Sequence, residues 1–342
     1  MGSAPDPGLE RPRRRRLALR LGLSLAATLA GLLVWEALWR LDVYGLDGFS
    51  VARMNSVKPI GRRGIVRASP HPEVGYELKP NLDLLFKMRP FQTSPAGLRD
   101  EPYPEAKPPG TYRIAVLGDS FTMGSGVALE DTYHSRLERL LAEGSEGTRY
   151  ECLNFGVAGY GLMNYVGTLR HRALRYAPDL ILVGLTANDR SAQRARALDD
   201  FGDAVEEEGL GFFFRFHCLD DAWRRLTGGG EPVSGEGAGR RQRGGRHLFL
   251  RESFAVLAEL GRRSGAPVVP VYLNMRQDAA SLETGELFAE IAAESGLELL
   301  DTSALFADRD IDELVIFPND YHPNEAAHAL FAGRIAEWLR RE

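Results

Sequence analysis

The stretch "IAVLGDSFTMGSG", residues 114–126, decides how this chain is read. An apolar run ends in Gly118-Asp119-Ser120, and small, polar and glycine residues follow at once. Most Gly-Asp-Ser triplets are turns, because glycine tolerates a positive φ and Asp and Ser hydrogen-bond their own backbone. A buried strand that ends in such a turn can also expose a nucleophilic serine, so the rest of the chain decides between the two interpretations.

Strand-like and helix-like segments alternate from residue 111 onward. Strands are predicted at "YRIAVLG" (112–118), "YECLNFG" (150–156), "PDLILVGL" (178–185), "PVVPVYLN" (267–274) and "LELLD" (297–301). Helices are predicted at about 130–144, 161–176, 252–264, 284–295 and 324–340, where apolar residues recur at helical spacing. This alternation predicts a parallel sheet with helices on both faces. Ligands of such sheets bind outside the carboxyl ends of the strands, which is where Ser120 falls.

A nucleophilic serine needs a base, and the best candidate is His322 in "FPNDYHPNEAAH" (317–328). Pro323 disfavours a helix at His322, and Asn324 is a good N-cap, so His322 is expected in a loop at the start of the last helix. Asp320 lies two residues before it. Two other histidines, His134 and His171, fall on predicted helices among charged residues and are expected to be solvated.

Two further residues follow predicted strands and could stabilise an oxyanion. Gly159 in "NFGVAGYG" follows the second strand and offers a backbone N–H, and Asn188 in "LTANDR" follows the third and offers an amide. Ser120, Gly159, Asn188 and His322 all fall at strand ends, and together they favour a nucleophilic site over a turn. Asp119 is expected to support the nucleophile turn.

From residue 112 to the C-terminus, apart from an insert at about 190–245, the sequence resembles the SGNH (GDSL-type) hydrolases. Their four sequence blocks resemble "GDSFTMG", "NFGVAGYG", "TAND" and "NDYHPN". The resemblance implies Ser120 as nucleophile, His322 as base, and an oxyanion hole formed by Ser120, Gly159 and Asn188. It also implies a flavodoxin-like three-layer α/β/α sandwich around a parallel sheet, and acyl transfer that requires no metal or organic cofactor.

Two positions depart from the family pattern. The third block usually begins with glycine, and Thr186 stands there instead. The acid commonly lies three residues before the histidine, where this chain has Asn319, whereas Asp320 lies two before. Asp320 is predicted to orient His322; if neither residue reaches the imidazole, a Ser-His dyad remains.

The N-terminus predicts a membrane anchor. A cluster of arginines within residues 1–16 precedes an apolar run over residues 17–39, and about 20 mostly apolar residues suffice to span a bilayer. The arginines are expected to stay cytoplasmic, which places everything after the span on the extracytoplasmic side. Trp35 and Trp39 suit the interface, with Glu36 at the far boundary. A cleaved signal peptide and a buried helix are the alternatives.

The domain organisation follows from these segments. We expect a cytoplasmic tail (1–16), a transmembrane anchor (17–39), a stalk and extended lead-in (40–110) and a hydrolase-like domain (111–342) with a flexible insert at about 190–245. The insert carries an aromatic patch at 212–216, interpreted as a lid, a substrate-facing surface or a small packed helix.

Composition excludes some partners. The chain of 342 residues is 44% hydrophobic with a formal net charge of -5, so a core is expected and nucleic acid is not an expected partner. Cys152 is expected in the core, and a disulfide with Cys218 is permitted outside the cytoplasm but not indicated by the sequence. Neither cysteine has metal-site spacing.

The predicted function is a serine esterase that hydrolyses acyl esters, acetyl esters among them, of envelope glycans or lipids. Two alternatives stay open. One is an O-acetyltransferase that modifies an envelope polysaccharide, and the other is a non-catalytic envelope assembly or binding protein.

Overall fold

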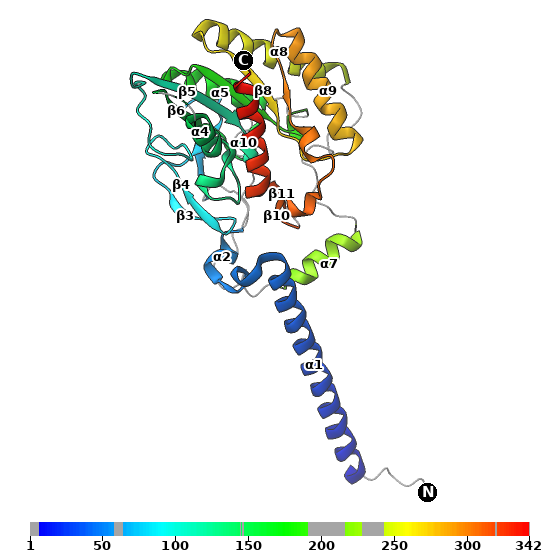
Figure 1. Ribbon diagram of the computed structural model, residues 1–342. Helices are drawn as coiled ribbons and strands as arrows, with labels where there is room; N and C mark the ends of the chain where they lie inside the picture. Colours follow the sequence, from blue (N-terminus) through cyan, green and yellow to red (C-terminus); the bar gives the residue numbers. More distant parts are fainter. Residues whose placement is uncertain are drawn as a thin grey trace.

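Five parallel strands form the central sheet of this computed structural model, which describes residues 7–57, 64–143, 145, 147–190, 216–227, 243–318 and 320–341. The strands are β5 (Thr111–Gly118), β6 (Arg149–Asn154), β7 (Leu180–Leu185), β8 (Val268–Tyr272) and β9 (Leu300–Asp301). They lie in the order β6-β5-β7-β8-β9 (Figure 1). Numbered along the chain this order is 2-1-3-4-5, the flavodoxin-like arrangement, whose ligand site lies where the order reverses, between β5 and β7.

Helices cover both faces of the sheet. Along β5, Ala115 and Leu117 belong to one core cluster, and Ile114 and Val116 belong to another, because successive side chains of a strand point to opposite faces. The first core contains α5 (Leu162–His171), α8 (Arg243–Ser264) and α9 (Ala279–Glu294), and the second contains α4 (Tyr133–Ala142) and α10 (Glu325–Leu339). The predicted three-layer sandwich is confirmed.

Two helices begin earlier than predicted. α9 begins at Ala279 because the side chain of Asp278 caps it, accepting a hydrogen bond from the Ser281 N–H at 3.0 Å. α8 begins at Arg243, inside the predicted insert, and Leu250 and Phe254 of this helix are fully buried in the core. Short 3-10 turns are η2 (Leu129–Asp131), η3 (Ala173–Tyr176), η4 (Ala187–Arg190), η6 (Ser303–Phe306) and η7 (Ile311–Glu313).

The lead-in packs on the hydrolase-like domain through two antiparallel strand pairs. These are β1 (Val66–Ala68) with β2 (Tyr76–Leu78), and β3 (Asp83–Phe86) with β4 (Arg89–Gln92). Val66, Tyr76 and Phe91 are buried in the same cluster as one face of the sheet. The β3–β4 turn is tight, with Lys87 at φ 47° and Met88 at φ 66°, as in a type I′ hairpin.

The N-terminal helix α1 (Pro7–Tyr44) projects from the domain and is followed by η1 (Gly45–Phe49) and α2 (Val51–Asn55) (Figure 1). Residues Arg15–Phe49 are long and apolar enough to cross a membrane, with a mean hydropathy of 1.9 in the most apolar window. None of the residues in that window is buried inside the protein. The alternative of a buried core helix is therefore not what the structure has. Glu36 is buried where α1 meets the rest of the protein, and its carboxylate pairs with Arg40 of the same helix at 2.7 Å.

Part of the insert packs beside α1. Helix α7 (His217–Thr227) contacts the end of α1, and the Cys218 N–H donates to a Glu36 carboxylate oxygen at 2.8 Å. Cys152 lies in the core as predicted, and both cysteines are buried free thiols. Residues 212–215 of the aromatic patch, and Asn319, lie outside the described residues.

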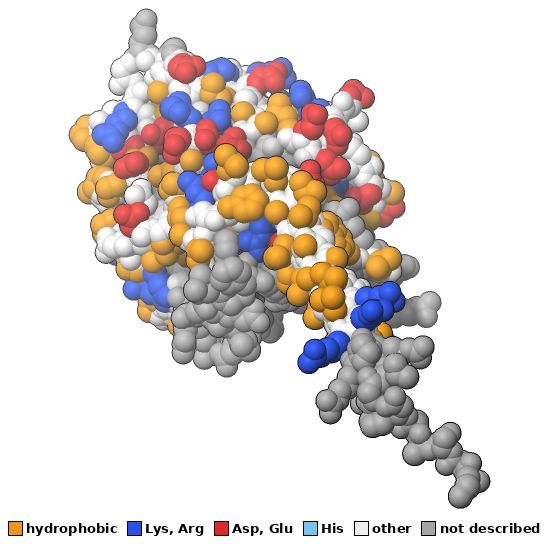
Figure 2. Space-filling model, turned by 90° about the horizontal axis from the view of Figure 1, so that it is seen from below, with side chains coloured by type: hydrophobic (Ala, Val, Ile, Leu, Met, Phe, Trp, Pro, Cys, Tyr) orange, Lys and Arg blue, Asp and Glu red, His pale blue; other side chains and the backbone are white. Residues whose placement is uncertain are grey.

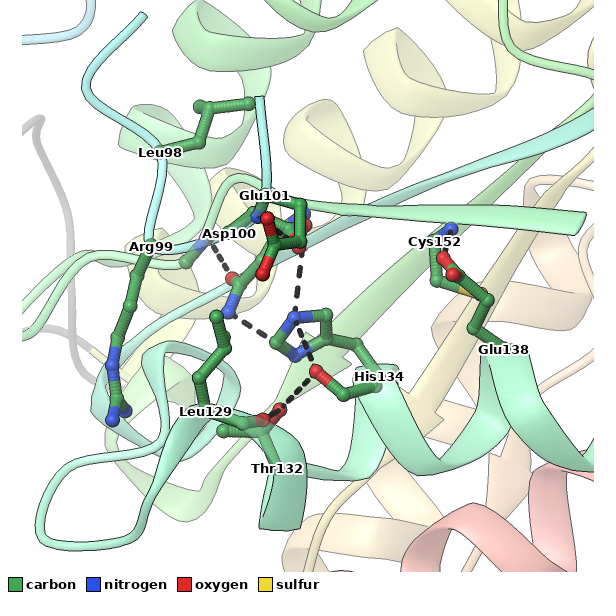
Figure 3. A network of polar contacts seen from close by, with 12 residues as sticks. Leu98, Arg99, Asp100, Glu101, Leu129, Thr132, His134, Glu138 and Cys152 are labelled. Carbon is green, nitrogen blue, oxygen red and sulfur yellow. Dashed lines mark hydrogen bonds and ion pairs between the residues drawn. The ribbon is translucent and has the colours of Figure 1, made fainter. Parts of the chain in front are cut away.

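The expectation for His134 was wrong. Its side chain is fully buried, because the first turn of α4 faces the lead-in rather than solvent. His134 Nε2 lies 3.6 Å from an Asp100 carboxylate oxygen. Figure 3 shows the two side chains facing each other. His171 is partly exposed, and its imidazole stacks on that of His71 with the ring centres 4.5 Å apart.

Candidate active site

The turn after β5 presents Ser120 at the carboxyl edge of the sheet. Ser120 is the first residue of the short helix α3 (Ser120–Met123), and the Asp119 side chain caps that helix by accepting from the Phe121 N–H at 2.9 Å. A Cβ on Gly118 would lie 1.9 Å from the Thr122 hydroxyl, so this strand-to-helix turn requires glycine. Asp119 thus supports the turn, as predicted.

His322 reaches Ser120 from a different part of the chain. It lies in β11 (Asp320–Pro323), which pairs with β10 (Val315–Phe317), so a short antiparallel pair stands where a loop was predicted. His322 Nε2 lies 2.8 Å from Ser120 Oγ, and His322 Nδ1 is hydrogen-bonded to Asp320 Oδ1. Because the carboxylate accepts at Nδ1, Nε2 is left to accept the proton of the Ser120 hydroxyl.

A lysine of the lead-in completes this cluster. Lys87 Nζ lies 2.5 Å from Asp320 Oδ2 and 3.1 Å from His322 Nδ1. Burial alone would raise the pKa of Asp320, but its hydrogen bond and charge interaction with His322, and then the Lys87 ammonium, outweigh burial. The pKa of Asp320 therefore lies well below its ordinary value, and the group is a carboxylate at neutral pH.

Gly159 lies in the loop that follows β6, beside the nucleophile turn. The Val157 N–H of this loop donates to the Gly118 carbonyl at 3.1 Å, which fixes the loop against the end of β5. Gly159 has a φ of 78°, a left-handed conformation that favours glycine. On the other side of the loop, the Tyr76 hydroxyl of β2 donates to the Ala158 carbonyl at 2.8 Å.

Asn188 lies in η4, directly after β7 on the other side of β5. Its neighbour Asp189 is buried and accepts from the Thr186 N–H at 2.8 Å, which closes the turn. The Thr186 hydroxyl donates to Asp119 Oδ2 at 2.9 Å. The residue that departs from the family's glycine thus ties the end of β7 to the cap of the nucleophile helix.

Arg99 of the lead-in holds the far end of α3. Its side chain is buried, and its guanidinium donates to the Met123 carbonyl at 2.7 Å and also to the carbonyls of Gly124 and Val127. Burial lowers the pKa of Arg99 to about 10, so the group remains a cation at neutral pH. The carbonyls of Met123 and Gly124 end α3, where a cation is favourable.

Asp100, the next residue of the lead-in, connects to α3 through Asn154. The Asn154 N–H, at the end of β6, donates to Asp100 Oδ2 at 2.8 Å, and the Asn154 amide donates to the Thr122 carbonyl at 3.0 Å. Figure 3 shows Asp100 between the chain at Arg99 and the imidazole of His134. The network links the lead-in, the end of β6 and α3.

Sequence reasoning missed Lys87, Arg99 and Asp100. Lys87 and Asp320 are 233 positions apart, and neither "FKMR" nor "GLRDEP" carries a motif that points to the site. Burial of Arg99 could not be predicted from a segment that reads as extended and polar. Among the described residues, no group of three or more His, Cys, Asp or Glu side chains could hold a metal ion.

Comparison with known proteins identifies the family. The sequence matches the GDSL-like Lipase/Acylhydrolase family over residues 116–330. No curated protein matches the chain.

Solved structures of similar fold include TesA, with 15% identity, a TM-score of 0.45, and coverage of 67% of this chain and 98% of that one. The acetylxylan esterase Axe2 of Geobacillus stearothermophilus has 16% identity and a TM-score of 0.42, and the match covers 66% of this chain and 93% of that one. A two-domain esterase active on acetylated mannans has 17% identity and a TM-score of 0.43, covering 68% of this chain but only 49% of its own.

The match to the family extends over more than half of the chain, from the end of β5 into α10. It includes Ser120, Gly159, Asn188 and His322, whereas Lys87 and Arg99 precede it. The chain belongs to the GDSL-like Lipase/Acylhydrolase family.

Proposed function

We propose that this chain is a serine ester hydrolase that works through an acyl-enzyme. The contact of Ser120 Oγ with His322 Nε2 at 2.8 Å, with Asp320 on the opposite ring nitrogen, carries the proposal. His322 takes the Ser120 proton as Oγ bonds to the ester carbonyl carbon. The N–H groups of Ser120 and Gly159 and the Asn188 amide are the proposed donors to the oxyanion.

His322 acts as the acid when the leaving group departs and as the base again when water attacks. The tetrahedral intermediate collapses, the ester C–O bond breaks, and the departing alkoxide takes the proton from His322. Water then loses a proton to His322 and attacks the acyl carbonyl; the bond between Ser120 Oγ and the acyl carbon breaks, His322 returns the proton to Oγ, and the carboxylic acid leaves. The Asp320 carboxylate stabilises the imidazolium that forms in each half, and none of these steps requires a metal.

We further propose that α1 anchors the enzyme in a membrane, with its arginine-rich N-terminus in the cytoplasm and the catalytic domain outside. The exposed apolar surface of α1, and the burial of Glu36 where α1 meets the rest of the protein, support this placement. The proposed substrates are acyl esters, acetyl esters among them, of envelope glycans or lipids.

The test uses the full chain in detergent with a fluorescent fluorophosphonate, and follows p-nitrophenyl acetate turnover in parallel. Wild type is expected to label and to turn over, and both signals are expected to vanish in Ser120→Ala and His322→Ala. Labelling without turnover would contradict hydrolysis and favour transfer of the acyl group to a specific acceptor, as in an O-acetyltransferase. A folded wild type that neither labels nor turns over would contradict the esterase and leave a binding role.

A further inference from the structure

Helix α7 has an apolar face that the catalytic domain does not cover. Leu219, Trp223 and Leu226 follow each other at helical spacing, with exposed fractions of 41%, 69% and 82%. Asp221 lies on the opposite side of the same helix, and Cys218, on the flank between the two sides, is buried. A helix with an exposed apolar face and a polar residue on the opposite side has the pattern of helices that lie on a membrane surface.

The position of α7 is fixed by contacts with the end of α1. Besides the Cys218 N–H bond to Glu36, the Trp39 indole N–H donates to Asp221 at 3.0 Å. The Trp39 ring stacks on the His217 imidazole, with the ring centres 6.1 Å apart. The apolar face of α7 therefore lies beside the end of the exposed apolar part of α1.

The turn after α1 adds to this surface. Leu46, Phe49 and Val51 of η1 and α2 are exposed by 82%, 47% and 36%. Figure 2 shows hydrophobic side chains gathered where α1 leaves the domain. We name this surface the collar; it consists of Leu46, Phe49, Val51, Leu219, Trp223 and Leu226. Because it continues the apolar surface of α1, we propose that the collar docks on the lipid bilayer that α1 enters.

The collar lies next to the candidate active site. The Tyr44 ring at the end of α1 packs edge-on against Phe317 of β10, with the ring centres 4.9 Å apart. Phe317 is the strand partner of Asp320, which contacts His322. A docked collar therefore holds the catalytic edge of the sheet at the bilayer surface. The substrate class that this position implies is an ester carried by a membrane-bound molecule, an inference that rests on the proposed esterase and anchor.

Environment-sensitive probes test the docking without reference to activity. The full chain is reconstituted in phosphatidylcholine vesicles after NBD labelling of Leu226→Cys in the collar, Leu33→Cys in α1, or Leu248→Cys, which is exposed on α8. The two native thiols are buried and should label poorly. Nitroxide lipids are expected to quench the probes at 33 and 226 but not the probe at 248.

The quenching outcomes separate the two claims. If the probe at 33 is quenched but the probe at 226 is not, the docking of the collar is contradicted and the anchor is retained. A probe at 33 that escapes quenching would overturn both the anchor and the docking.

Substrate presentation tests the substrate class. Turnover of a fluorogenic phospholipid ester in the same vesicles is compared with turnover of soluble p-nitrophenyl acetate. L219S/W223S/L226S is expected to lose at least about tenfold on the lipid ester and to keep the soluble rate, because less apolar surface docks. The control L248S/L282S changes exposed leucines of α8 and α9. It is expected to keep the wild-type rate on both the lipid ester and the soluble ester.

Equal loss on both substrates in the collar variant, or none on either, would overturn the inference. Absence of turnover of both substrates by wild type would instead contradict the proposed esterase, and the probe results would still decide the docking.

Discussion

Lys87 Nζ lies 2.5 Å from Asp320 Oδ2, although 233 positions separate the two residues. The hairpin that carries Lys87 is itself fixed, because the Lys87 N–H donates to the Ser56 carbonyl at 2.7 Å. His322 occupies one carboxylate oxygen of Asp320 and Lys87 the other. The lead-in thus sets the orientation and charge of the group that is proposed to orient the base.

Lys87→Met is expected to lower kcat by roughly tenfold, about 1.4 kcal/mol in activation free energy, with little change in KM. Without the ammonium, the pKa of Asp320 rises toward its ordinary value and the carboxylate is held by one partner fewer. Steady-state kinetics on p-nitrophenyl acetate, with K87M measured beside wild type, test this expectation.

Arg89→Met is the matched control for Lys87. Arg89 lies on the same hairpin and pairs with Glu325 at 2.9 Å, away from Ser120 and His322. Its loss is expected to leave kcat unchanged. A kcat of K87M equal to that of wild type would restrict Lys87 to a structural role.

Asp320→Asn is expected to lower kcat by about four orders of magnitude, because the amide no longer stabilises the imidazolium and favours the wrong tautomer. Asn319→Ala, at the position where the family commonly has its acid, is expected to keep wild-type turnover. The two variants are compared by steady-state kinetics on p-nitrophenyl acetate. The reverse result, a damaged N319A beside an active D320N, would assign the orienting role to Asn319.

The sheet and the strand-end residues were predictable because they depend on local patterns. Apolar runs that end in Gly118 and Leu185 specify buried strands, and the parallel topology brings the residues after each strand to one edge. The β10–β11 pair was not predictable, since "FPNDYHPN" is short and rich in turn residues. Burial of His134 also depends on a partner, Asp100, that is distant in the sequence.

The roles of Arg99 and Lys87 were likewise not predictable from the sequence. Arg99 and Lys87 act through contacts with Met123 and Asp320 that only the folded chain creates. Charged residues in an extended segment are most often solvated, so their burial follows from tertiary packing rather than from local propensity. The apolar N-terminal helix is recognisable from hydropathy, whereas the packing of α7 on the end of that helix is not.

Thr186→Val is expected to lower the free energy of unfolding by about 1.5–3 kcal/mol, because the hydrogen bond to the buried Asp119 carboxylate is lost. Thr186→Ser keeps the hydroxyl and should keep most of the stability. Denaturant unfolding measures the difference, and turnover at a temperature where both variants are folded reports whether the nucleophile turn has shifted. Equal stability of T186V and T186S would show that the hydroxyl contributes nothing.

Buried His328 is expected to make the folding stability depend on pH. Burial, followed by the charge of nearby Arg99, lowers the pKa of His328 well below its ordinary value of 6.5. Its Nδ1 accepts from the Tyr133 N–H at 3.1 Å, which requires a neutral ring. Below about pH 6.5 the unfolded chain takes up a proton that the folded chain refuses, so stability falls as pH falls, by about 1.4 kcal/mol per pH unit.

His328→Gln keeps an acceptor for the Tyr133 N–H and removes the titration. Urea unfolding from about pH 7 to pH 5 is expected to show a lower stability for H328Q at pH 7 but a shallower decline toward acid, by about one proton's contribution. The difference in slope, rather than the absolute stability, isolates the imidazole, because any loss of packing is the same at every pH. Parallel stability curves for wild type and H328Q would mean that the folded chain accommodates a charged His328.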